Sequence, residues 1–146
     1  MRTTGYRSNP GAGKRKIAGD QYEGTYIHKR DGYYYLIVST GDFMKDYHVV
    51  VGRSRSLMGP YVDRAGRDML GVHHELVVGN GNGFVAPGHN AEFITDDKGQ
   101  DWMLYHTRLE VGGPRYLLLD RIEWNDGWPE VRGHVPARSA EAPVFE

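Results

Sequence analysis

The chain has 146 residues, with 18 Lys and Arg against 19 Asp and Glu, 7 His and no Cys, which fits one modest globular domain. A net charge of −1 excludes binding of nucleic acid or of an anionic membrane through a general positive field, and the lack of cysteine excludes disulfides, thiolate nucleophiles and cysteine metal sites. The sequence contains no apolar run near the roughly 18 residues of a membrane-spanning helix and begins without the apolar block of a signal peptide, so we expect a soluble chain with no export signal of its own. The sequence does not indicate in which compartment the protein acts.

Aromatic residues and glycines dominate the pattern, with 10 Tyr, 3 Trp and 4 Phe beside 20 Gly. Aromatic runs separated by glycine turns are typical of short antiparallel strands. Because no ten-residue window shows the spacing of an amphipathic helix, we expect an all-β fold with under about a tenth of the chain helical.

The N-terminal half of the pattern begins with a basic segment without periodicity, residues 1–19, which we interpret as an arm or a remnant loop. Residues 21–39 form two β-rich runs around Asp31-Gly32, a strong hairpin signal. Residues 47–54 contain three consecutive valines and predict a buried strand.

The C-terminal half continues with strands and turns. Two apolar runs surround the glycine-rich segment 79–83, and two more, 91–95 and 102–107, surround the turn 96–99, so we predict two further hairpins. A last strand is predicted over 115–124, and prolines argue against a central strand in the tail. Such a series fits a sandwich, a barrel or part of a propeller, and periodicity alone does not choose among them.

Glu23 is the first candidate for chemistry, because it stands between aromatic residues and beside Gly24. A carboxyl surrounded by rings loses hydration, which favours its protonated form and suits proton donation to a leaving group. The alternative is an ordinary glutamate that faces water at a strand end.

His89 is the second candidate, since Pro87 and Gly88 fix it at a turn where it suits a metal ligand or a proton partner, the alternative being a structural histidine. His73-His74 and Tyr105-His106 are better explained structurally, because strand neighbours point to opposite faces. The glycine run 79–83 is better explained as a turn than as a phosphate-binding loop, because no helix follows it.

In order along the chain, these segments closely resemble the family 43 glycoside hydrolases, in particular the arabinan endo-1,5-α-L-arabinosidases. The resemblance runs from about Ile17 to Val131 and rests on an ordered series of motifs: Glu23-Gly24-Thr25-Tyr26-Ile27, Gly32-Tyr33-Tyr34-Tyr35-Leu36, Val51-Gly52-Arg53-Ser54, Gly59-Pro60-Tyr61-Val62-Asp63, Pro87-Gly88-His89-Asn90, Leu104-Tyr105-His106, Asp120-Arg121-Ile122, Trp124 and Gly127-Trp128-Pro129.

The resemblance implies a five-bladed β-propeller whose active site lies at one end of its channel, and an inverting hydrolase of α-L-arabinofuranosyl linkages acting on plant cell-wall arabinan or arabino-oligosaccharides. Glu23 matches the general acid, with Tyr22 and Thr25 beside it as substrate-binding residues. His89 matches a channel histidine that in many members helps to hold a calcium ion or a water cluster. Thr25 replaces a proline that many relatives have, and a short loop over residues 40–46 puts the shape of the sugar subsites in doubt.

The resemblance also implies that part of the ring is absent. The family's two catalytic aspartates precede the glutamate motif, and here no matching motif precedes Glu23. At roughly 40 to 50 residues a blade, 146 residues supply about two and a half to three antiparallel blades.

We therefore expect the C-terminal part of a propeller over residues 20–132, followed by a tail over 133–146. Exposed blade faces predict a homo-oligomer or docking onto a complementary N-terminal half that supplies the general base. The alternative is a non-catalytic carbohydrate-binding module or a self-assembling half-propeller.

Overall fold

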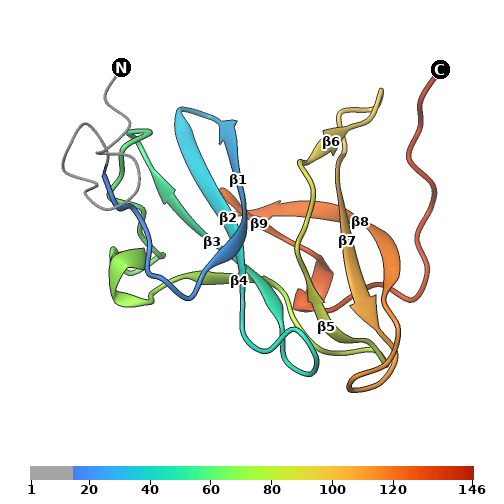
Figure 1. Ribbon diagram of the computed structural model, residues 1–146. Coiled ribbons are helices and arrows are strands. Elements are labelled where there is room, and N and C mark those ends of the chain that lie inside the picture. Colours follow the sequence, from blue (N-terminus) through green and yellow to red (C-terminus); the bar gives the residue numbers. More distant parts are fainter. Residues whose placement is uncertain (1–14) are drawn as a thin grey trace, which may run out of the picture.

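The computed structural model describes residues 15–146 and shows two antiparallel sheets side by side (Figure 1). The first sheet has the strand order β1-β2-β3-β4, formed by β1 (Glu23–Arg30), β2 (Tyr33–Thr40), β3 (His48–Ser54) and β4 (Glu75–Val78). Its first hairpin turns at Asp31-Gly32, where both residues have positive φ, so the hairpin predicted from this pair is confirmed.

The second sheet has the strand order β5-β7-β8-β9, with β6 paired to β7 beside β5. Its strands are β5 (Val85–Gly88), β6 (Ile94–Thr95), β7 (Asp101–Arg108), β8 (Tyr116–Asn125) and β9 (Trp128–Glu130). The two described helices are single 3₁₀ turns, Met69–Gly71 and Arg132–His134, so the expectation of little helix is confirmed for residues 15–146. In this same stretch no helix is both long and apolar enough to cross a membrane.

The glycine-rich segment 79–83 is not the turn of a hairpin, and that prediction was wrong. It does form a tight local turn, in which Gly81 and Phe84 exchange backbone hydrogen bonds of 3.1 and 2.9 Å. However, β4 before it closes the first sheet and β5 after it opens the second, so the segment links two sheets. A turn signal reports a local reversal of the chain and carries no information about which sheet the next strand joins.

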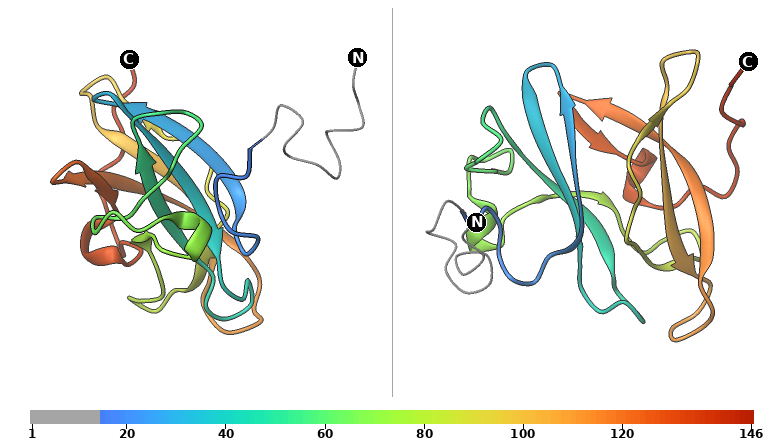
Figure 2. Two further views of the ribbon diagram at one scale, coloured as in Figure 1. Left: turned by 90° about the vertical axis from the view of Figure 1, so that its left-hand side faces the viewer. Right: turned by 45° about the horizontal axis from the view of Figure 1, so that its top comes forward.

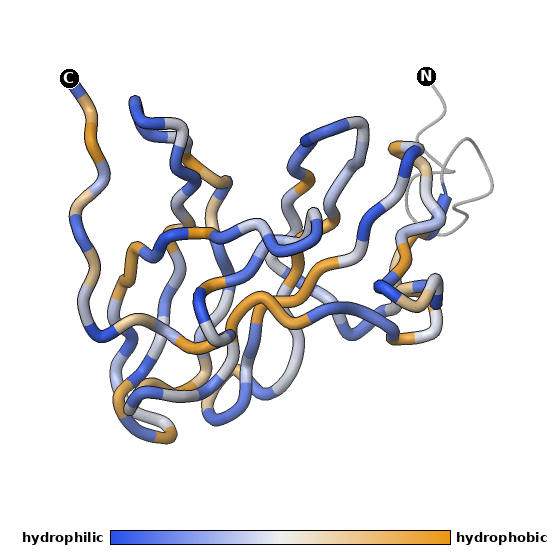
Figure 3. Tube along the Cα trace, turned by 180° about the vertical axis from the view of Figure 1, so that it is seen from behind, coloured by the Kyte–Doolittle hydropathy of each residue, from blue (hydrophilic) through white to orange (hydrophobic). Residues whose placement is uncertain are grey.

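The main core fills the space between the two sheets, because alternate residues of each strand point to one face. From the first sheet it receives Tyr35, Ile37, Val49 and Val51, and from the second Phe93, Met103, Tyr105, Ile122 and Trp128. In Figure 3 the hydrophobic colour follows the middles of the strands, whereas many of the turns are hydrophilic. A second cluster covers the outer face of the first sheet, with Leu36, Val38 and Val50 under Tyr61 and Met69.

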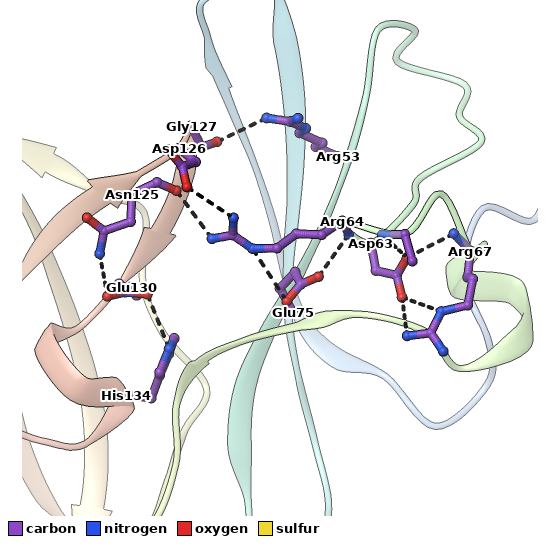
Figure 4. Close-up of polar contacts among 11 residues, drawn as sticks. Arg53, Asp63, Arg64, Arg67, Glu75, Asn125, Asp126, Gly127, Glu130 and His134 are labelled. Atoms are coloured by element: carbon purple, nitrogen blue, oxygen red, sulfur yellow. Dashed lines mark hydrogen bonds and ion pairs between the residues drawn. The ribbon is translucent and has the colours of Figure 1, made fainter.

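Polar contacts also join the sheets at the turn between β8 and β9 (Figure 4). Arg64 donates to the carbonyl of Asn125 at 3.3 Å and lies 3.9 Å from the carboxylate of Asp126. The carbonyl of Gly127 accepts hydrogen bonds from the Tyr35 hydroxyl at 2.5 Å and from Arg53 at 3.3 Å. The turn is thereby fixed to the first sheet, and the two sheets form one packed unit.

The chain after β9 adds no strand within the described residues, so residues 15–146 hold two blades, fewer than length alone suggests. This C-terminal segment runs along the far side of the second sheet from the first (Figures 1 and 2). The carbonyl of Val144 accepts a 2.9 Å hydrogen bond from the backbone of Asp97, and the Asp96 carboxylate accepts one from the backbone of Val144 at 3.3 Å.

We expect Asp96 to make the stability of the fold dependent on acid. Burial by itself would raise the pKa of Asp96, but hydrogen bonds from backbone N–H groups and from the indole of Trp102 lower it below its ordinary value. A lowered folded-state pKa gives stability that is present above about pH 4 and is lost as pH falls through the folded-state value. Asp96→Asn should therefore lower the free energy of unfolding at pH 7, and its difference from the wild type should narrow as pH falls below about 4.

Urea unfolding at several pH values checks this expectation, with Asp31→Asn in the exposed β1–β2 turn as the control. A constant difference between Asp96→Asn and the wild type from pH 7 to pH 3 would contradict it.

Candidate active site

Glu23 is the first residue of β1, an edge strand of the first sheet, and its partner on β2 is Ser39. The register shifts between Glu23 and Tyr26, and Gly24 within this bulge has a φ of +61°. A Cβ on Gly24 would lie 3.3 Å from the Cα and Cγ atoms of His89, so glycine permits this close approach. The bulge thereby places Glu23 next to the segment that carries His89.

His89 directly follows β5, the first strand of the second sheet, and has a φ of +53°. Its backbone N–H donates a 2.8 Å hydrogen bond to Oγ of Ser39, the residue opposite Glu23. The His89 side chain is exposed. Ser39, which is fully buried, therefore fixes the backbone of His89 beside the start of β1.

Tyr47 holds the carboxylate of Glu23. The Tyr47 side chain is 1% exposed, and its hydroxyl donates a 2.7 Å hydrogen bond to Oε1 of Glu23. Gly88 makes room for this ring, because a Cβ there would collide with it. Burial and, after it, the hydrogen bond to Glu23 raise the pKa of Tyr47, so the phenol keeps its proton and stays a donor at neutral pH.

His106 of β7 lies between the rings of Tyr47 and His89. Its ring centroid is 6.3 Å from that of Tyr47 and 6.1 Å from that of His89, with interplanar angles of 23° and 25°. Burial, followed by the charges of Arg115 and His89, lowers the pKa of His106, which therefore favours the neutral imidazole at pH 7. Its Nδ1 atom is buried and makes no hydrogen bond within residues 15–146.

The structure brings together two of the four residues predicted for the site, Glu23 and His89. Thr25 lies exposed within the β1 bulge. Tyr22 packs against the outer cluster of the first sheet and hydrogen-bonds Nδ1 of His74 at 2.7 Å, away from the group around Glu23. The expected loss of hydration at Glu23 is not observed, because its side chain is exposed; two blades cover only part of its surroundings.

Sequence reasoning missed Tyr47, Ser39 and His106. Tyr47 and Ser39 carry no local signal, because their roles arise from pairing between strands and from the room left by Gly88. His106 was interpreted as structural from its position next to Tyr105, yet the twist of β7 places its ring against His89.

Calcium near His89 stays a prediction. Calcium takes six to eight oxygen ligands in proteins. Within residues 15–146 no group of three or more His, Asp or Glu side chains is arranged to hold a metal ion. These residues alone do not fit a calcium site, so we derive no step of the reaction through a metal.

Comparison with known proteins decides the family. Residues 3–129 match the family described as glycosyl hydrolases family 43, which is most of the chain. The chain belongs to glycosyl hydrolase family 43. Among its relatives, an extracellular exo-α-(1→5)-L-arabinofuranosidase of Cellvibrio japonicus is 33% identical over 117 residues, 76% of this chain and 33% of the relative. An extracellular endo-α-(1→5)-L-arabinanase of Thermotoga petrophila is 32% identical over 147 residues, 81% of this chain and 31% of the relative.

Solved structures of the family agree with this assignment. The α-L-arabinanase of Cellvibrio cellulosa complexed with arabinohexaose matches with a TM-score of 0.68 and 34% identity, over 76% of this chain and 36% of that one. The family 43 neighbours are five-bladed propellers, so the two sheets are a partial β-propeller, as predicted. The chain spans about a third of the length of these relatives.

Proposed function

We propose that this chain forms the acid-bearing part of a family 43 glycoside hydrolase that cleaves α-L-arabinofuranosyl linkages of arabinan with inversion. The observation that supports the proposal is the position of Glu23 at the channel-facing edge of a blade, held by Tyr47 and next to His89. Relatives that match most of this chain are named for arabinan or α-(1→5)-L-arabinofuranosyl linkages.

In this proposal Glu23 is the general acid. The bond between the anomeric carbon and the leaving oxygen breaks as the Glu23 proton passes to that oxygen. A water molecule attacks the anomeric carbon from the opposite face and loses a proton to a second carboxylate, the general base. Inversion requires these two carboxyl groups about 6.5 to 9.5 Å apart, with the water between base and sugar.

We propose that the base comes from outside this chain. The only acidic residue before Glu23 is Asp20. Asp20 forms a 2.7 Å ion pair with Lys16, and its side chain is 90% exposed. The nearby residues Ile17, Ala18 and Tyr22 pack on the outer face of the first sheet, so this segment is directed away from Glu23 and the second blade.

The second sheet offers a face on which further blades would pack. Leu118 of β8 faces the core, so its two neighbours in the strand, Leu117 and Leu119, face the opposite way. These two side chains are 71% and 39% exposed. We propose that this face contacts a complementary N-terminal part of a family 43 propeller, which completes both the ring and the site.

Reconstitution tests the proposed function. The chain is mixed with the separately produced part of the Cellvibrio japonicus relative that precedes the matched segment, and reducing ends released from linear arabinan are counted. We expect hydrolysis from the mixture that neither part shows alone, with light scattering reporting the complex.

Three other outcomes separate the alternatives. Binding of arabino-oligosaccharides without products from any mixture would favour a carbohydrate-binding module. A concentration-dependent oligomer of this chain without binding would favour a self-assembling half-propeller. Hydrolysis by the chain alone would contradict an external base.

A further inference from the structure

We infer that Tyr47 is a positioning residue that determines which oxygen of the Glu23 carboxyl carries the catalytic proton. The inference rests on the proposed function, because it assigns a task within the proposed reaction. It is carried by the contacts around Tyr47, a residue that touches the acid and that the proposed reaction does not otherwise use.

The geometry makes the two carboxyl oxygens of Glu23 different. The Tyr47 hydroxyl donates its proton to Oε1, so Oε1 is the acceptor of this hydrogen bond. In a protonated carboxyl the carbonyl oxygen is a stronger hydrogen-bond acceptor than the hydroxyl oxygen, so a hydrogen bond donated to Oε1 favours the form with the proton on Oε2. The catalytic proton therefore resides on Oε2, the oxygen free to face the leaving group.

Tyr47 is suited to this task because neither its position nor its proton changes easily. Its ring packs against Gly88 on one side and is stacked with His106, so the hydroxyl has a fixed direction. Burial raises its pKa, and the hydrogen bond to Glu23 adds to this effect. The groups that face it are Glu23 of β1, Ser39 of β2 and His106 of β7, and the Ser39 hydroxyl lowers its pKa as a smaller, opposing influence.

The same arrangement couples the acid to the second blade. The Ser39 hydroxyl accepts a hydrogen bond from the backbone N–H of His89 and lies against Tyr47. The Tyr47 hydroxyl in turn donates a hydrogen bond to Glu23. These contacts fix the position of the proton-donating carboxyl relative to both β1 and β5, the edge strands of the two sheets, and not relative to its own strand alone. Misplacing a reacting group by about 1 Å costs on the order of 10²-fold in rate.

The contact is tested first on the chain alone, with tyrosines labelled by ¹³C at Cζ. We expect the Tyr47 Cζ signal at pH 7 to differ between the wild type and Glu23→Gln, because the hydroxyl then donates to an amide oxygen instead of a carboxylate oxygen. Tyr61 is the internal control, because its hydroxyl donates a 2.9 Å hydrogen bond to the backbone carbonyl of Leu57, a group that carries no charge. A Tyr47 signal that behaves the same in the wild type and in Glu23→Gln would overturn the inference.

The role is then tested in the reconstituted hydrolase with Tyr47→Phe, which removes the hydroxyl and keeps the ring. We expect kcat on arabino-oligosaccharides, which have poor leaving groups, to fall about 10²-fold with KM nearly unchanged. Hydrolysis of 2,4-dinitrophenyl arabinofuranoside, whose leaving group needs no proton, should change less than about threefold. The matched control is Tyr61→Phe, which should leave both substrates unaffected.

Equal losses on both substrates would overturn the positioning role, since they would indicate general damage to the site. An unchanged rate on both would overturn it as well. Absence of hydrolysis from the wild-type mixture, with a Tyr47 signal that does change in Glu23→Gln, would instead overturn the proposed function and show that the contact serves only the fold.

Discussion

Glu23→Gln is expected to lower hydrolysis of arabino-oligosaccharides by the reconstituted enzyme on the order of 10²-fold to 10⁴-fold, because the amide has no proton to donate to the leaving oxygen. Glutamine keeps the size of the side chain and still accepts the hydrogen bond from Tyr47, so the structure of the β1 bulge should persist. Initial rates from reducing-end release, with wild type and variant at equal concentration, measure the effect.

A control for the lost charge is Glu92→Gln, which removes another exposed carboxylate, in the loop between β5 and β6 and near Tyr26 of β1. We expect Glu92→Gln to retain at least half of the wild-type rate. A substrate with a leaving group that needs no protonation should also restore most of the rate of Glu23→Gln. If Glu23→Gln cleaved arabino-oligosaccharides as fast as the wild type, another residue would be the acid and our assignment would fail.

Trp128→Ala is expected to destabilise the fold by about 3–5 kcal/mol, as large-to-small changes of buried aromatic residues do. The Trp128 side chain is 3% exposed and lies at the junction of the two blades. Its ring contacts Tyr35 edge-on at 6.3 Å, and the guanidinium groups of Arg53 and Arg64 lie 4.5 and 5.5 Å from its centroid. Its removal opens a cavity and removes the aromatic face against which the guanidinium groups of Arg53 and Arg64 pack.

Urea denaturation monitored by far-UV circular dichroism measures this effect. Leu117→Ala is the matched control, because it also removes an apolar side chain from the second sheet, but from a face that is exposed in the isolated chain. We expect Leu117→Ala to change the free energy of unfolding by less than about 0.5 kcal/mol. A similar small change for Trp128→Ala would mean that the blades are not joined through this residue.

Much of the fold could be predicted because its signals are local. The Asp31-Gly32 turn, the three valines of β3 and the turn between β6 and β7 each specify their own conformation. The division into two sheets could not be predicted from the same kind of signal. The chain between β4 and β5 reads as a hairpin, and only the packing of the two core faces separates its flanking strands.

In the candidate site, too, the residues in local motifs could be predicted, and those placed by long-range contacts could not. Glu23 and His89 stand in motifs with a glycine that permits close approach, and this made them visible in the sequence. Tyr47, directly before β3, and His106 of β7 stand in no distinctive motif. Their importance comes from contacts over 24 and 17 positions, with Glu23 and His89 respectively. Tyr22 was predicted to bind substrate because it is next to Glu23 in the sequence. Its side chain packs instead on the outer face of the first sheet, away from the group around Glu23.

The central claim is that sugar binds at the end of the channel marked by Glu23. An NMR titration of the ¹⁵N-labelled chain with arabinotriose, up to millimolar concentrations, tests it most directly. We expect chemical-shift changes concentrated at Glu23, Tyr47, His89 and His106, which weaken in Glu23→Gln. Changes confined to the opposite end of the first sheet, around Tyr33 and Arg53, or no changes at all, would contradict it.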